Sequence, residues 1–192
     1  MLTASYDLRY LQAGIDQLEP YLLARDLYRP SGLQPASGKP PYPQLTPGWL
    51  LLARRRAEAT VQTPAERETL QRLSQQLDEM RARWRSAWGL RAQAEFHARL
   101  NLWRDFLEEY RRNPAENDDR YAYEVNRRVA LELLRPEASP LASAEIQALG
   151  GLDLWLQAIL MPGPFIWEAR LIPSFPSDPF WYLYGKLPKH AP

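Results

Sequence analysis

The amino-acid sequence predicts a mostly α fold, an irregular bundle of four to six helices with one long central helix and a small C-terminal β-hairpin. Leucines recur at three- and four-residue spacing through most of the first 160 residues, and the last thirty residues are rich in aromatic and branched side chains. We expect a single helical domain, with a bundle over 1–161 that includes a Pro-rich loop at 28–47, and a Pro- and aromatic-rich hairpin and tail over 162–192.

The composition excludes several classes of protein. The 192 residues are 45% apolar and 24% charged, as in folded globular domains, and the net charge is only +1. The absence of cysteine excludes disulfides, thiolate nucleophiles and iron–sulfur clusters. Two histidines without a Glu-x-x-His pattern argue against a metal site, and no phosphate-binding loop is present. We therefore expect no metal and no cofactor.

Hydropathy argues against a membrane protein. The longest apolar stretch, residues 152–167, is interrupted by Asp153, Gln157 and Pro162. A helix that spans a bilayer needs about 20 consecutive apolar residues. The N-terminal residues also lack the apolar run of a secretory signal. The sequence therefore predicts a soluble, cytoplasmic protein with no membrane partner.

The first predicted helix covers about residues 4–27 and has one apolar stripe. Its members lie three or four residues apart: Leu8, Leu11, Ile15, Leu18 and Leu22. We expect a kink at Pro20, because proline lacks the N–H group that a helix interior needs. The six prolines of residues 28–47 predict a stiff loop that wraps over the helices. An exposed ligand for the aromatic groove of a partner is the alternative.

Two capping signals mark the next helices. Thr46, followed by proline, predicts the N-cap of a helix that ends near residue 61. Thr63 and Glu66 form a capping box that begins the long central helix. No strong breaker follows before Pro114, so a straight helix here would be about 70 Å long.

The central helix has an apolar seam in two registers. The first run keeps strict three- and four-residue spacing: Leu70, Leu73, Leu77, Met80 and Trp84. A second run from Phe96 to Tyr110 is out of phase with the first. We expect the helix either to bend near Gly89 or to project from the molecule and pair with another chain.

Two further helices and a hairpin complete the predicted fold. Helical stripes cover about residues 118–134 and 144–160, and the second of these contains two adjacent glycines. Residues 165–172 and 180–187 have the composition of β-strands, and a Pro-rich turn joins them.

His97 is the candidate for acid–base chemistry. Glu95 lies two residues away, so a helix directs the two side chains to different sides, and Asp105 is two turns further on. This spacing favours a structural histidine. We therefore expect no catalytic residue and no enzyme.

The C-terminal aromatic residues are the strongest indication of function. Only one face of a hairpin can lie on the helices, so some rings are expected at a protein interface unless the Pro-rich loop covers them. The rings concerned are Trp167, Phe175, Trp181, Tyr182 and Tyr184. We predict a non-enzymatic protein-interaction or assembly module that self-associates through residues 64–112 or through the hairpin.

Two other functions are alternatives. Residues 54–112 contain 13 arginines and 9 acidic residues, and Arg54, Arg55 and Arg56 are consecutive, which is compatible with nucleic-acid binding. The interleaved acidic residues favour a solvated helix face instead, so nucleic acid is the less favoured partner. A small-molecule pocket lined by the C-terminal aromatic residues is the third hypothesis.

Overall fold

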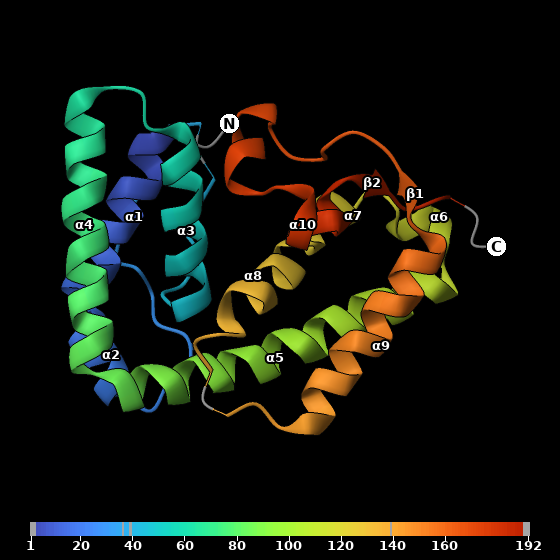
Figure 1. Cartoon of the computed structure of the whole chain (residues 1–192), viewed down its shortest axis with the longest axis horizontal. Helices are drawn as coiled ribbons and strands as arrows, with labels where there is room; N and C mark the ends of the chain where they lie inside the picture. Colours follow the sequence, from blue (N-terminus) through green and yellow to red (C-terminus); the bar gives the residue numbers. More distant parts are fainter. Residues whose placement is uncertain (1–2, 36, 39, 139, 190–192) are drawn as a thin grey trace.

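The computed structural model of the chain describes residues 3–35, 37–38, 40–138 and 140–189. These residues form ten α-helices, two short 3-10 helices and a two-stranded antiparallel sheet. The mostly α fold and the small C-terminal sheet are therefore confirmed (Figure 1). Among the described helices, six have nine residues or more. His190 lies outside the described residues.

Figure 1 shows two groups of helices, an N-terminal and a C-terminal lobe. The N-terminal lobe contains α1 (Ala4–Asp16), α2 (Leu18–Leu23), α3 (Pro47–Thr60) and α4 (Pro64–Arg83). The C-terminal lobe begins with α5 (Arg85–Arg112), α6 (Pro114–Asn117), α7 (Tyr121–Glu124), α8 (Asn126–Leu134) and α9 (Ser143–Ile159). It ends with β1 (Met161–Pro162), η1 (Ala169–Ser174), α10 (Ser177–Phe180), η2 (Trp181–Leu183) and β2 (Gly185–Lys186).

The N-terminal lobe packs α1 against α3 and α4. Its core includes Leu50 from α3 and Leu77 from α4, both fully buried. Tyr42, from the Pro-rich loop, stacks on Tyr6 of α1 with ring centroids 4.2 Å apart. The loop over 28–47 therefore lies against the helices, as expected.

The kink expected at Pro20 occurs three residues earlier. α1 ends at Asp16, Gln17 has φ −103° and ψ 0°, and α2 begins at Leu18. Pro20 consequently lies in the first turn of α2, where its missing N–H removes no helical hydrogen bond.

The long central helix breaks at Trp84, and the bend expected near Gly89 is wrong in position. Trp84 has φ −108° and ψ 32°, whereas Gly89 is buried inside α5. The apolar seam of α4 faces the N-terminal core, but residues from Phe96 onward face the C-terminal core. Because the two seams face different cores, α5 leaves α4 in a new direction (Figure 1).

The C-terminal sheet is shorter than expected, and its strands differ from the predicted ones. Met161 pairs with Lys186, so the first strand lies before 165–172 and the second is the end of 180–187. The chain between them forms 3-10 and α turns. The prolines at 173, 176 and 179 supply no N–H to a strand ladder, which disfavours strands in this segment.

A buried carboxylate holds α3 against α5. The side chain of Glu95 is fully buried and accepts hydrogen bonds from the Thr46 hydroxyl at 2.6 Å, the Gly48 N–H at 2.7 Å and Arg99 Nε at 2.6 Å. Thr46 also caps α3 as predicted, because its Oγ1 accepts the Trp49 N–H. A Cβ atom on Gly48 would lie 2.7 Å from Glu95 Oε1, so this close approach requires glycine.

The capping box of α4 provides a direct test of the helix start. Thr63 Oγ1 accepts the Glu66 N–H at 3.2 Å, so Thr63→Ala leaves that N–H without its partner. We expect the free energy of unfolding in urea to fall by about 1 kcal/mol. The matched control is Thr69→Ala, which removes an exposed hydroxyl inside the same helix and should change stability by less than about 0.5 kcal/mol. Equal losses in the two variants would contradict a capping role.

Candidate functional site

The apolar seam predicted as an interaction surface lies inside the N-terminal lobe. Leu70, Leu73 and Leu77 are buried in the N-terminal core, where α4 packs against α1. Met80 and Trp84 are partly buried against the same core. The expectation of a free seam is therefore corrected, since α1 of the same chain covers it.

The C-terminal aromatic residues are also used within the chain. Phe175 and Tyr182 are fully buried. Trp167, Trp181 and Tyr184 are partly buried against the C-terminal core. The second face of this segment meets α3, which packs against η1, so the expectation of an exposed aromatic face is corrected as well.

The three consecutive arginines point to three different partners. Arg54 forms ion pairs in the space between α3 and α4, and Arg55 lies over the Phe180 ring at 4.9 Å. Arg56 forms a buried ion pair with Asp7 at 2.7 Å. Burial raises the pKa of Asp7, and the Arg56 charge opposes that rise. These side chains therefore do not present one basic patch to solvent.

His97 has partners that the sequence did not indicate. Its Nδ1 lies 3.0 Å from Glu145 Oε1 on α9, and its Nε2 lies 3.2 Å from the side-chain nitrogen of Asn101. Glu95 turns into the core instead, as its two-residue offset predicts. Within the described residues, no cluster of three metal-ligating side chains is present. His97 therefore connects α5 to α9 at the surface.

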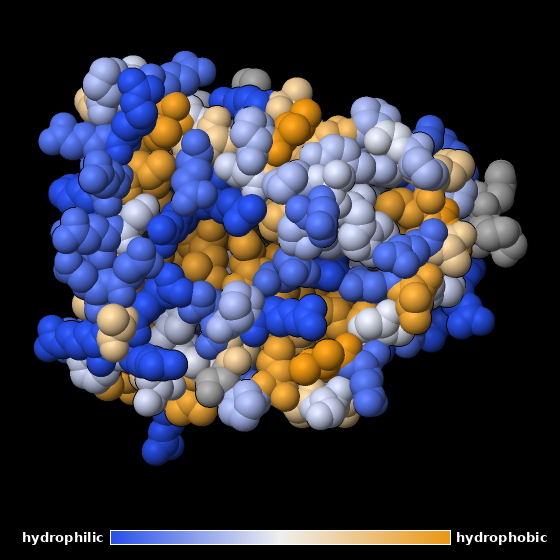
Figure 2. Space-filling model, viewed as in Figure 1, coloured by the Kyte–Doolittle hydropathy of each residue, from blue (hydrophilic) through white to orange (hydrophobic). Residues whose placement is uncertain are grey.

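A concave cleft lies between the two lobes. A hollow of about 910 Å³ lies between the end of α4, the start of α5 and the segment after α8. Its walls include Arg85, Trp88, Leu90 and Pro136. A smaller hollow of about 220 Å³ lies between α3 and the end of α8. Figure 2 shows a hollow in this region, with hydrophobic residues on its floor and hydrophilic residues around it. We call the two hollows together the interlobe cleft.

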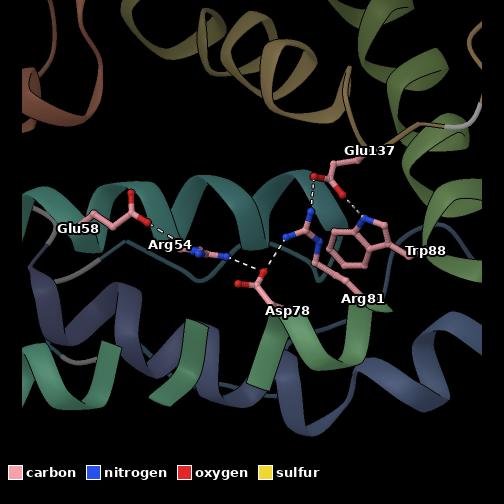
Figure 3. A network of polar contacts seen from close by, with 6 residues as sticks. All are labelled: Arg54, Glu58, Asp78, Arg81, Trp88 and Glu137. Atoms are coloured by element: carbon pink, nitrogen blue, oxygen red, sulfur yellow. Dashed lines mark hydrogen bonds and ion pairs between the residues drawn. The ribbon is translucent and has the colours of Figure 1, made fainter. Parts of the chain in front are cut away.

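A chain of alternating charges crosses the cleft (Figure 3). Its charged members, in order, are Glu58, Arg54, Asp78, Arg81 and Glu137, and a hydrogen bond from Trp88 ends the chain. Asp78 Oδ1 accepts from Arg54 at 2.8 Å and from Arg81 at 2.7 Å. Glu137 binds Arg81 and accepts the indole N–H of Trp88 at 2.8 Å. This network joins α3 and α4 to the C-terminal lobe.

Arg81 and Glu137 are the best-shielded pair of this network. Their side chains are 25% and 15% exposed, and the Arg81 guanidinium lies 5.5 Å from the centre of the Trp88 ring. Arg85, on the wall of the larger hollow, is exposed and has no ion pair among the described residues. The cleft therefore combines internally neutralised charges, an apolar wall and one available cation.

The sequence could not indicate this cleft, because its walls come from four helices, α3, α4, α5 and α8, and from the segment after α8. The relative placement of these elements depends on contacts between residues that are distant in the sequence. No protein-family model, curated protein or solved structure matches this chain. Among the helices of the described residues, none is both long enough and apolar enough to cross a membrane.

A double-mutant cycle on Arg81 and Glu137 measures how strongly the network joins the lobes. We expect Arg81→Gln and Glu137→Gln, alone and together, to give a coupling of about 1 kcal/mol in urea unfolding, because both side chains are partly shielded from water. The control cycle uses Arg112 and Glu108, an exposed pair that should couple by about 0.3–0.5 kcal/mol. Equal coupling in the two cycles would show that the network adds nothing beyond a surface ion pair.

Proposed function

We propose that this chain is a non-enzymatic protein-interaction module that binds an extended segment of a partner protein in the interlobe cleft. The observation that carries the proposal is the cleft itself, an open hollow of about 910 Å³ between the lobes. Surface hollows with apolar walls and a few polar groups are the usual places where proteins bind other molecules.

The chemistry of the cleft indicates what the partner segment contains. Leu90 is 65% exposed, and Pro136 and Pro140 are exposed beside it, so this wall suits a large apolar side chain. Arg85 supplies a cation without an internal partner. An acidic residue next to an apolar residue matches both features.

The other readings have less support from the geometry. Nucleic-acid binding needs several cations that face phosphates together, whereas Arg54, Arg55 and Arg56 each have a partner within the chain. A small-molecule site usually encloses most of its ligand, but much of the cleft lining is exposed. Among the described residues, the C-terminal aromatic rings pack in or against the C-terminal core, which does not favour a ligand pocket lined by them.

Selection from a displayed library of random peptides tests this function. We expect enriched peptides to contain an acidic residue beside a large apolar one. Leu90→Asp and Arg85→Glu should each weaken the binding of a selected peptide at least tenfold, because they remove the apolar wall and reverse the free charge. Leu154→Asp, a similar change at an exposed leucine on α9, should leave binding unchanged. The proposal would be overturned if no peptide is enriched, or if the selected peptides bind both cleft variants as tightly as the wild type.

A further inference from the structure

Two hydrogen-bond donors on the wall of the interlobe cleft point at one carboxylate (Figure 3). The Arg81 guanidinium, from α4, donates to Glu137 Oε1, and the indole N–H of Trp88, from α5, donates to Glu137 Oε2 at 2.8 Å. The guanidinium also lies 5.5 Å from the centre of the Trp88 ring. The two donors are therefore held side by side, and each of them binds a different oxygen of the same carboxylate.

The fold fixes the two donors more firmly than it fixes the carboxylate. Trp88 is 3% exposed and belongs to the N-terminal core, and Arg81 is also held by Asp78, which accepts a hydrogen bond from it at 2.7 Å. Both donors lie on long helices. Glu137 instead lies in the turn that follows α8, beside the exposed Pro136. Because connecting segments are more mobile than helices, the carboxylate can leave the donors without disrupting a helix.

The donor pair borders the hollow in which we propose that a partner segment binds. Arg81, Trp88 and Glu137 line this hollow together with Arg85, which attracts an acidic side chain to the same wall. A second carboxylate that enters beside Glu137 would be repelled by it. A carboxylate that replaces Glu137 keeps both donors satisfied and leaves the charge around them unchanged. Charge and hydrogen bonding therefore favour exchange of one carboxylate for another.

We infer that Arg81 and Trp88 form a carboxylate-binding subsite of the cleft, which Glu137 fills in the free chain and an acidic side chain of the partner fills in the complex. This inference rests on the proposed function of the cleft and names how that site is regulated. Glu137 is an internal competitor, because it leaves the donors before the partner's carboxylate binds them. The affinity for the partner is therefore reduced by the fraction of molecules in which Glu137 has left the subsite.

Chemical rescue with acetate tests the subsite without a peptide. Glu137→Ala removes the internal carboxylate and leaves both donors on the wall of the hollow. We expect about 100 mM sodium acetate to raise the melting temperature of this variant by about 2–4 °C relative to sodium chloride, because acetate binds the folded state with a Kd of roughly 10 mM. The wild type should show no such difference. In an NMR titration of Glu137→Ala, the indole N–H resonance of Trp88, identified by its loss in Trp88→Phe, should shift with the same Kd.

Two control variants show whether acetate acts at this subsite. Arg81→Gln combined with Glu137→Ala lacks the cation of the subsite, so acetate and chloride should give this double variant the same melting temperature. Glu132→Ala removes a carboxylate whose partner is Arg128 on its own helix, and it should also show no acetate effect. The subsite is overturned if acetate does not stabilise Glu137→Ala, or if it stabilises the double variant equally.

The affinity of a peptide selected against the cleft tests the competition. We expect Glu137→Gln to tighten the binding of an acidic peptide by about fivefold or more, because glutamine is uncharged and binds Arg81 more weakly than a carboxylate does. Glu132→Gln is the matched control and should bind the peptide like the wild type. If Glu137→Gln binds the peptide no more tightly than the wild type, the competition is overturned and the proposed function of the cleft stands. If acetate rescues Glu137→Ala but no peptide is selected, the subsite stands and the proposed function is contradicted.

Discussion

The buried carboxylate of Glu95 is the contact on which the arrangement of the two lobes depends. It accepts hydrogen bonds from the first turn of α3 and from Arg99 on its own helix. Gly48 brings the α3 backbone close enough for this contact. A carboxylate at a helix start also satisfies N–H groups that have no partner within the helix. The start of α3 is consequently fixed on α5.

The position of α3 determines which residues its other side chains contact. Trp49 packs against both hydrophobic cores, and Arg56 reaches the buried Asp7 of α1. Arg54, two residues before Arg56, points in another direction and pairs with Asp78 in the polar network across the cleft. Because α5 leaves α4 at Trp84, a cleft remains between the lobes, and this network crosses it.

Sequence patterns were sufficient for features that depend on neighbouring residues. The capping box at Thr63 and the N-cap at Thr46 follow from local hydrogen bonding, and the leucine stripe of α4 follows from helical periodicity. Features that depend on distant residues could not be predicted. Their four-residue spacing predicts that Glu95 and Arg99 form an ordinary solvated ion pair. The two side chains are buried because α3 packs over them, which the sequence does not indicate. The cleft likewise depends on how helices distant in the sequence pack together.

The most direct test of this account is the stability of Glu95→Gln in urea unfolding. The glutamine amide has one oxygen that accepts and one NH₂ group that only donates. In either orientation the NH₂ group would face a donor, either the Gly48 N–H or the Arg99 guanidinium. A buried N–H group or a buried charge would then lose its hydrogen-bond acceptor. We expect a loss of about 3 kcal/mol, whereas the exposed control Glu79→Gln should change stability by less than about 0.5 kcal/mol. A loss below about 1 kcal/mol for Glu95→Gln would contradict the claim that this carboxylate holds the lobes together.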